Sequence, residues 1–492
     1  MTAFAATGGL TPERIWLTPV RAHVGLTLLF LLRALAAMLL PLSADEAYYW
    51  LWSKHLEAGY YDHPPAIAFL IRAGTSLFGD TPGGVRAAGV LLSLAATWFV
   101  WQSARSLLKN EARALLAALL FNLTLMMGVE LLAATPDLPS IVTAAAFLFC
   151  LARLQETEDG RWWLAAGVAA GLGLLSKYSA LFLGAGALLW LLANPRGRAW
   201  LKTPWPWIGG LLALLVFLPN LIWEAGHQWE TFVFQFGRVG HGHLTARYLL
   251  EFLGAEFGLA TPCIFILGVC GLLRARRGDD RFLLTALMLP AIAFFFIHAL
   301  HERVQGNWPC FLFPAFAIMA ADSWSAPASE SPGWKRWVSI AAIPLAALML
   351  LLVYLQALTG ILPLGNRDPM ARLLGVGFHA IADSVADAAR GGAVLTTDYE
   401  TAAWLRFYEP GLKVVQVGET WRYPSAPAAE NFSGTLLYLV ETRRDQSDTL
   451  RRYFSVVELA SRLKISRKGT ELSDYALMRL DGQKAPVPGK RP

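Results

Sequence analysis

The sequence predicts an all-α polytopic membrane protein that carries a small α/β domain at its C-terminal end. Hydrophobic residues make up 55% of the 492-residue chain, and charged residues make up only 16%. The mean hydropathy of +0.44 excludes an ordinary soluble enzyme. Long apolar runs stop near residue 358 and short strand-like segments follow, so we divide the chain into a membrane domain at 1–358 and a soluble domain at 359–480.

Eleven apolar runs are long enough, or nearly so, to cross about 30 Å of hydrocarbon, and the pattern allows ten to thirteen. They lie at 22–41, 83–104, 114–129, 136–152, 162–176, 178–193, 206–223, 249–273, 282–300, 308–322 and 337–358. The N-terminus shows no short apolar segment with a small-residue cleavage site, so we expect the first span to be retained. Small residues at 165–173 indicate close helix packing.

The distribution of basic residues predicts the orientation. With a cytoplasmic N-terminus, the inner loops carry fourteen Lys and Arg residues and the outer loops carry six, in agreement with the positive-inside rule. The net charge of +6 therefore reflects topology and does not indicate nucleic-acid binding. An odd number of spans places the C-terminal domain on the outer side. The remaining polar clusters also fall on that side, so we expect function at the outer face.

Two outer loops stand out. The first, at 42–82, is rich in Trp and Tyr, which favour the membrane interface, and we expect short helices there that are interrupted at Pro64–Pro65. The second, at 224–247, carries His227, His241 and His243. It fits either a lid over a substrate or a plain connector, and both readings stay open.

The C-terminal domain has apolar segments typical of strands. We predict strands at 393–397, 412–417, 435–440 and 453–458, and helices at 370–390 and 399–408. Residues 481–492 are rich in Pro and Lys and are expected to be disordered. The four cysteines lie in or beside apolar runs without metal-ligand spacing, so we expect free thiols at Cys150, Cys263, Cys270 and Cys310.

The densest chemistry follows the first apolar run, at 43–65. This stretch holds the adjacent acids Asp45 and Glu46 and the pair Asp62 and His63. Carboxylates at a membrane edge can supply a general base, because an acceptor hydroxyl must lose its proton as a bond forms to it. Cationic side chains on the same face can stabilise an anionic leaving group such as a phosphate, and the candidates are Lys177, Arg303, His63 and His301.

Each of these residues also has a structural reading. Asp137 follows Pro136 at a helix start, where an acid is stabilised by the helix dipole. Lys177 can extend from a helix end toward water, and a lone histidine such as His301 is more often structural than functional. The acids after the first span can simply mark its end.

Five motifs in order, DEAYYW, GYYDHPP, TPD, LLSKYS and HERVQGNWP, resemble the bacterial members of glycosyltransferase family 39 and the related aminoarabinose (lipid A) transferases. The resemblance covers about residues 20–330. It implies a GT-C membrane fold and a polyprenyl-phosphate sugar donor. It also implies transfer to a lipid A, core oligosaccharide, other glycoconjugate or protein acceptor, at the periplasmic face of a bacterial inner membrane.

The resemblance also implies roles for the matching residues. Asp45 corresponds to the catalytic base, with Glu46 beside it, and Asp62 and His63 fall where relatives have an acid and a lysine before proline. His63 is a departure, because histidine is only partly protonated near neutral pH. The second acids of the outer side are Asp137 and Glu130, and the expected contacts to the donor phosphate are His63, Lys177, Tyr178, His301 and Arg303.

The mechanism expected from this assignment is a single inverting displacement, with Asp45 as base and polyprenyl phosphate as leaving group. A divalent metal ion held by Asp62 remains an open alternative for neutralising the phosphate. The main rival function is a polytopic lipid or sugar transporter or flippase, although transporters place their charges near mid-membrane in two related halves. A binding protein anchored by its membrane domain is a third reading.

Overall fold

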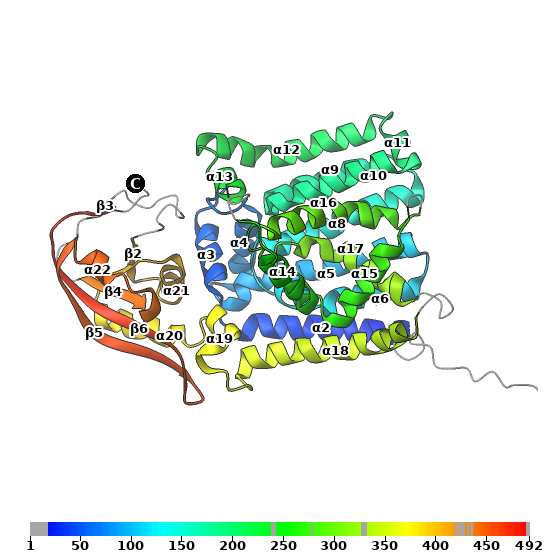
Figure 1. Ribbon diagram of the computed structural model, residues 1–492. Helices are drawn as coiled ribbons and strands as arrows, with labels where there is room; N and C mark the ends of the chain where they lie inside the picture. The colour runs from blue at the N-terminus through cyan, green and yellow to red at the C-terminus, as the bar shows by residue number, and fades with distance from the viewer. Residues whose placement is uncertain are drawn as a thin grey trace, which may run out of the picture.

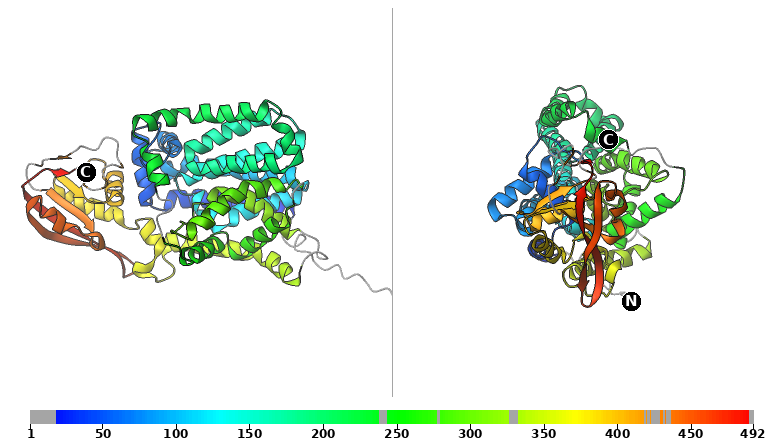
Figure 2. Two further views of the ribbon diagram at one scale, coloured as in Figure 1. Left: turned by 45° about the horizontal axis from the view of Figure 1, so that its top comes forward. Right: turned by 90° about the vertical axis from the view of Figure 1, so that its left-hand side faces the viewer.

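The computed structural model describes residues 18–237, 243–276, 279–325, 332–417, 419, 422, 429–430, 432 and 436–488. A body of helices lies beside a smaller domain that contains the strands, and both are seen in Figure 1. The long helices of the body run roughly along one direction, and the C-terminal domain stands at one end of them, as the two views of Figure 2 show. The helical body comprises residues up to the end of α18 at Thr359.

Each of the eleven predicted apolar runs falls on helix. The helices of the body are α2 Pro19–Leu39, α3 Ala44–Lys54, α4 Ala66–Phe78, α5 Pro82–Leu108, α6 Glu111–Leu123, α7 Leu125–Glu130, α8 Asp137–Thr157, α9 Trp162–Ser176, α10 Leu181–Ala193, α11 Pro195–Trp200, α12 Trp205–Gly226, α13 Glu230–Phe236, α14 Arg247–Leu259, α15 Pro262–Arg274, α16 Phe282–Ala299, α17 Phe313–Trp324 and α18 Gly333–Thr359. As predicted, the first outer loop forms two short helices, α3 and α4, with Pro64–Pro65 between them.

The predicted count of eleven membrane-spanning helices is not confirmed. Among the described residues, six helices are long and apolar enough to span, or seven with the pair α14 and α15. The run predicted as one span at 249–273 forms two helices, α14 and α15, which are bent by 107° relative to each other, as in a broken span or a re-entrant loop. Thr261 has a positive φ of 62° at the break, and Pro262 starts the new helix. The protein is nevertheless a multi-pass membrane protein.

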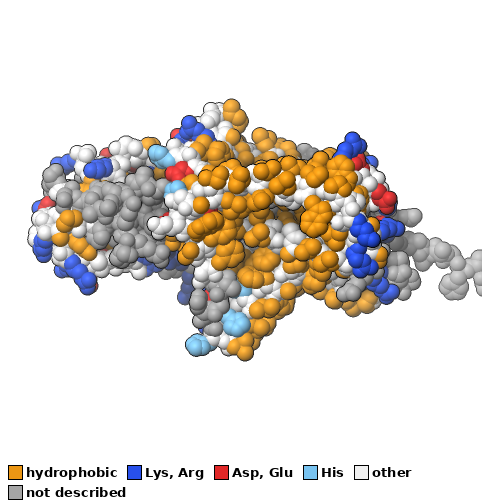
Figure 3. Space-filling view, turned by 90° about the horizontal axis from the view of Figure 1, so that it is seen from above, with side chains coloured by type: hydrophobic (Ala, Val, Ile, Leu, Met, Phe, Trp, Pro, Cys, Tyr) orange, Lys and Arg blue, Asp and Glu red, His pale blue; other side chains and the backbone are white. Residues whose placement is uncertain are grey.

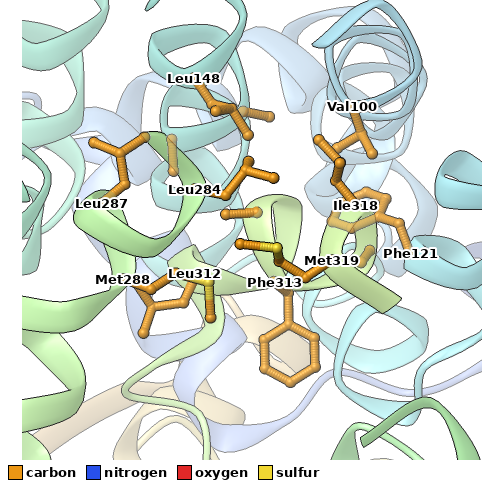
Figure 4. Packing of buried hydrophobic residues seen from close by; sticks show 14 of the residues in the cluster. Val100, Phe121, Leu148, Leu284, Leu287, Met288, Leu312, Phe313, Ile318 and Met319 are labelled. Atoms are coloured by element: carbon orange, nitrogen blue, oxygen red, sulfur yellow. The ribbon is translucent and has the colours of Figure 1, made fainter. Parts of the chain in front are cut away.

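The surface and core of the body agree with a membrane environment. Hydrophobic side chains form a broad band over the helices in Figure 3, and Lys and Arg side chains gather at the end remote from the C-terminal domain. Inside, Val100, Phe121, Leu148 and Ile318 pack together from different helices in Figure 4. The small residues at 165–173 do serve close packing, because a Cβ on Gly167 would lie 2.1 Å from the backbone oxygen of Gly209 in α12.

The C-terminal domain contains a five-stranded sheet with the order β2-β1-β4-β6-β5. Strands β1, β2 and β4 run parallel, whereas β4, β6 and β5 run antiparallel. The strands are β1 Ala393–Thr396, β2 Lys413–Gln416, β3 Ala429–Glu430, β4 Leu436–Glu441, β5 Phe454–Arg467, β6 Thr470–Gln483 and β7 Val487–Pro488. The helices are α19 Pro369–Leu373, α20 Phe378–Ala389, α21 Tyr399–Tyr408 and α22 Ser447–Leu450.

The four predicted strands and the helix at 399–408 are confirmed, and the helix predicted at 370–390 is divided into α19 and α20. The sequence prediction missed β6, which pairs with β5 and has the same length. The disordered tail predicted at 481–492 is wrong for its first part, because β6 ends at Gln483 and β7 pairs with β3. Residues 489–492 lie outside the described residues.

The C-terminal domain packs directly on the first outer loop. Trp404 of α21 donates a hydrogen bond from its indole to the carbonyl oxygen of Leu42 at 3.0 Å. The rings of Trp50 and Phe407 meet edge to face with their centroids 5.1 Å apart. One buried hydrophobic cluster contains residues of both α3 and α21, so this contact is part of the core rather than a loose tether.

Candidate active site

A cavity of about 850 Å³ lies where the first outer loop, the helical body and the C-terminal domain meet. Its wall has an apolar part, to which Leu181, Phe182, Phe294 and Phe295 contribute. The sequence-predicted residues that line the polar part are Asp45, Glu46, Asp62, His63, Glu130, Asp137, Lys177 and Tyr178. Groups separated by more than a hundred positions in the sequence therefore share one space.

Asp45 is the half-buried carboxylate of this cavity. It occupies the first turn of α3, and its Oδ1 accepts a hydrogen bond of 2.9 Å from the hydroxyl of Tyr399 in α21. Burial raises the pKa of Asp45 to about 6, although the bond from Tyr399 opposes this effect. A carboxylate with a pKa near neutral is suited to accept a proton, because it is ionised and still basic.

Glu46, the neighbour of Asp45, takes part in a buried ion pair with Arg86. Its two carboxylate oxygens accept 2.6 Å bonds from the Nε and Nη2 of Arg86, and both side chains are 1% exposed. It also closes a capping box with Ser43 and accepts from the backbone N–H of Ala134 at 2.9 Å. The catalytic role of Glu46 stays a prediction, whereas its contacts show that the side chain fastens α3 to α5, because a buried carboxylate requires such partners.

Asp62 and His63 lie beside the C-terminal domain. The Oδ2 of Asp62 accepts from the hydroxyl of Tyr48 at 2.6 Å, and its Oδ1 accepts from Nη1 of Arg422 at 2.7 Å. The Nδ1 of His63 lies 3.5 Å from the amide nitrogen of Gln235 in α13. The segment predicted as a lid or connector thus reaches the cavity through α13. Its His241 lies outside the described residues.

The surroundings of Asp62 do not fit the divalent metal ion that the sequence left open as an alternative. Both of its carboxylate oxygens already accept bonds, one of them from a guanidinium, which repels a cation. Within the described ranges there is no group of three or more His, Cys, Asp and Glu side chains that could hold a metal. No step of the mechanism below passes through one.

Asp137 and Lys177 form a third ion pair among the residues that line the cavity. The Nζ of Lys177 lies 2.6 Å from Oδ1 of Asp137, whose other oxygen accepts from the side-chain amide of Asn307 at 2.8 Å. The thiol of Cys310 donates to the same Oδ1 at 3.0 Å. Asp137 is therefore more than a helix cap. It holds Lys177 and the 300–309 segment at the cavity wall.

Glu130 ends α7 close to this pair. Its Oε2 accepts a long 3.4 Å bond from Thr135. Burial and the nearby charge of Asp137 raise the pKa of Glu130 well above its ordinary value, which favours the protonated form of this carboxyl. A protonated carboxyl can donate a hydrogen bond to an anionic ligand.

Three residues predicted to contact the phosphate have other partners or lie away from the cavity, and their role stays a prediction. Tyr178 lines the cavity, but its hydroxyl bonds to Asn220 at 2.9 Å and Glu224 at 3.0 Å. His301 and Arg303 do not line the cavity. Arg303 pairs with Glu251 of α14 at 2.9 Å, and its side chain is 62% exposed.

Sequence reasoning missed several residues that shape the site. Arg86 lies at the start of an apolar run, where a lone charge indicates a buried partner, and the S-x-x-E pattern of Ser43–Glu46 is the signature of a capping box. The motif HERVQGNWP reaches the cavity through Gln305, Asn307 and Trp308 rather than through its basic residues. Tyr399 and Arg422 come from the C-terminal domain, which the motifs do not cover.

Comparisons with known proteins agree with this architecture. Residues 62–223 match the family described as dolichyl-phosphate-mannose-protein mannosyltransferase. Lipid A galacturonosyltransferase RgtD of Rhizobium johnstonii is 30% identical over 285 residues, which cover 56% of this chain and 59% of that protein. Undecaprenyl phosphate-alpha-4-amino-4-deoxy-L-arabinose arabinosyl transferase of Edwardsiella ictaluri is 27% identical over 292 residues, which cover 55% of this chain and 50% of that protein. The match thus spans little more than half the length of these relatives.

A solved structure shows the same fold over nearly the whole chain. The crystal structure of ArnT from Cupriavidus metallidurans bound to undecaprenyl phosphate matches with a TM-score of 0.64 at 16% identity, covering 93% of this chain and 97% of that chain. At this identity the likeness establishes the fold and not the activity. The chain therefore has the ArnT-like GT-C fold and resembles in sequence the bacterial family 39 and aminoarabinose-transferase-like membrane glycosyltransferases.

Proposed function

We propose that this protein is an integral-membrane glycosyltransferase that moves a sugar from a polyprenyl-phosphate donor to a hydroxyl group of a lipid or glycoconjugate acceptor, with inversion. The site would face the periplasm from the inner membrane of a bacterium, as the positive-inside rule predicts. The observation that carries the proposal is one cavity that combines a half-buried carboxylate, two ion-paired cations and an apolar wall. By their names, the two relatives described above act on lipid A and on an undecaprenyl-phosphate aminosugar.

The residues divide the chemistry between them. Asp45 accepts the proton of the acceptor hydroxyl, and the acceptor oxygen attacks the anomeric carbon from the face opposite the phosphate. As this bond forms, the bond from the anomeric carbon to the phosphate oxygen breaks and its electron pair leaves with the phosphate. The product is polyprenyl phosphate with one more negative charge than the donor phosphodiester.

That new charge needs a cation close by. Lys177 lines the cavity and spends one of its three N–H donors on Asp137, so the others can reach a phosphate oxygen. His63 lines the same space and contributes a second donor when it is protonated. The aromatic and aliphatic wall formed by Leu181, Phe182 and Phe295 suits the first isoprene units of the donor.

The same arrangement argues against the transporter alternative. The titratable groups of the cavity lie at the end of the helical body that bears the C-terminal domain, and the two relatives named above are glycosyltransferases. A transporter would place such groups near mid-membrane. Release of polyprenyl phosphate during turnover separates the two functions, because a transporter leaves the donor intact.

The decisive test compares purified wild-type protein with the variants Asp45→Asn and Asp383→Asn on a panel of polyprenyl-phosphate sugars. Asp383 is a matched control, since its carboxylate lies on α20 and is 49% exposed. We expect the wild type and the control to release polyprenyl phosphate, measured by mass spectrometry, and Asp45→Asn to be slower by about 100-fold or more. Undiminished release by Asp45→Asn would remove it from the base role, and no release by the wild type from any donor would refute the function.

A further inference from the structure

The C-terminal domain places one arginine in the cavity. Arg422 lines it together with Asp62, and its Nη1 donates to Oδ1 of that carboxylate at 2.7 Å. The guanidinium carbon lies 4.4 Å from the centre of the Tyr399 ring, which packs against it. With 17% of its side chain exposed, Arg422 is held on two sides and still open to the cavity.

The hydrogen-bonding capacity of this guanidinium is not used up. Among the described residues, Nε of Arg422 is a buried donor without a hydrogen-bond partner. Its Nη2 lies 3.9 Å from Glu419, which is longer than a hydrogen bond. The edge formed by Nε and Nη2 therefore keeps hydrogen-bonding capacity that the described residues do not use, although Nε is buried and Nη2 lies within ion-pair distance of Glu419. Two parallel donors of this kind have the geometry that binds a carboxylate in a bidentate manner. A buried donor left unpaired costs free energy that a ligand can recover.

The position of this edge indicates which part of the donor it meets. Tyr399, whose ring packs against the guanidinium of Arg422, also donates a hydrogen bond from its hydroxyl to Asp45, the proposed base. The base must lie beside the bond that forms between acceptor and sugar, so Arg422 lies on the sugar side of the reaction. Lys177, the proposed phosphate ligand, comes from the end of α9 and is paired with Asp137 instead.

We propose that Arg422 is a specificity-determining residue that binds the carboxylate of an acidic sugar, so that the donor is a polyprenyl-phosphate uronic acid. This inference rests on the proposed glycosyltransferase function and names its substrate class. It also gives the C-terminal domain a role: it completes the sugar site, and it packs rigidly on α3 because the site requires a fixed distance between Arg422 and Asp45.

The experiment measures kcat/KM of the full-length protein with three donors: polyprenyl-phosphate galacturonic acid, polyprenyl-phosphate galactose and polyprenyl-phosphate aminoarabinose. The first two sugars differ only in a carboxylate against a hydroxymethyl group. The variants are Arg422→Gln, Arg422→Lys, and the control Arg462→Gln, whose side chain is 53% exposed on β5. The midpoint of thermal unfolding of each variant verifies folding, and Arg422→Lys keeps a cation beside Asp62 in case the glutamine variant is unstable.

We expect the wild type to prefer the galacturonic acid donor. Arg422→Gln should lower kcat/KM for that donor by about 10- to 100-fold, mostly through KM, and change the value for galactose less than about threefold. Arg422→Lys should lose part of the preference because it lacks the planar fork. An equal loss with both sugars, no loss with either, or a wild-type preference for galactose or aminoarabinose would overturn the proposal. A wild type that releases polyprenyl phosphate from none of the donors refutes the glycosyltransferase function itself.

Discussion

Replacing Arg86 with glutamine should destabilise the protein more than replacing its partner Glu46 with glutamine, although both variants lose the same ion pair. In Arg86→Gln, the Glu46 carboxylate keeps only the bonds from Ser43 and from the backbone N–H of Ala134. A buried charge that loses its partner costs about 3–5 kcal/mol. In Glu46→Gln, the guanidinium still donates to three carbonyl oxygens of the segment that ends α2. We expect the free energy of unfolding of Glu46→Gln to fall by about 1.5–3 kcal/mol, which is the usual contribution of a hydrogen bond to a charged group.

The pH dependence gives a second check on the same pair. Although burial raises the pKa of Glu46, the charge and hydrogen bonds of Arg86 outweigh it and hold the pKa below its ordinary value of 4.5. A depressed carboxyl pKa contributes stability that is present above pH 4.5 and is lost as the pH falls through the lower folded-state value. The loss in free energy of unfolding that Arg86→Gln causes, relative to the wild type, should therefore be largest near neutral pH. It should shrink in acid, where Glu46 of the variant takes up a proton.

The assay follows tryptophan fluorescence during thermal unfolding of detergent-purified protein at several pH values, together with release of polyprenyl phosphate per folded molecule. Glu46→Gln should keep its turnover within about threefold, because the side chain acts on the position of α3 and not on the acceptor. The reasoning is refuted if Glu46→Gln unfolds at a lower temperature than Arg86→Gln. A turnover loss as large as that of Asp45→Asn would return Glu46 to the catalytic residues.

Two further predictions concern the cavity. Because Asp45 must be ionised to act as base and has a pKa of about 6, kcat/KM should fall about tenfold per pH unit below pH 6. Tyr399→Phe should move this acidic limb of the pH–rate profile to higher pH by up to about one unit, because it removes a hydrogen bond that favours the carboxylate. An acidic limb that stays in place contradicts the role of Tyr399. Lys177→Met should lower turnover by about 100- to 1000-fold and stability by about 3–5 kcal/mol, because Asp137 is left unpaired. Adding Asp137→Asn should restore the unfolding midpoint but not turnover, and a double variant that recovers turnover would show that Lys177 is only structural.

Local patterns in the sequence were sufficient for the class of protein and for the placement of its helices. Hydropathy depends on each stretch alone, so every predicted apolar run falls on helix, and the outer-loop helices and four strands are found where they were expected. The predicted number of spans is not confirmed, because several of the apolar runs form helices shorter than the six long ones among the described residues, and because one run is bent at Thr261. Strand β6 was missed because its alternating pattern is weak.

The residues of the site also fall into two groups: those that the sequence motifs indicated and those that only the fold brought to the cavity. The motifs correctly identified the segments that line the cavity, since eight of the ten predicted site residues are found there. His301 and Arg303 are not, although their motif contributes neighbouring residues. The contributions of Tyr399 and Arg422 lay beyond sequence reasoning, because nothing in a strand or helix pattern indicates that a distant domain will pack against α3.

Hydrophobicity, basic-loop asymmetry and the ordered motifs determined by themselves that this chain is a membrane protein with its ionisable groups at one end. Only the three-dimensional fold decided which of two adjacent acids is available for chemistry. Asp45 and Glu46 differ by one position, but one residue along a helix turns a side chain by about 100°. That turn directs Glu46 to Arg86, forty positions away, and Asp45 to the cavity and to Tyr399, which is 354 positions away.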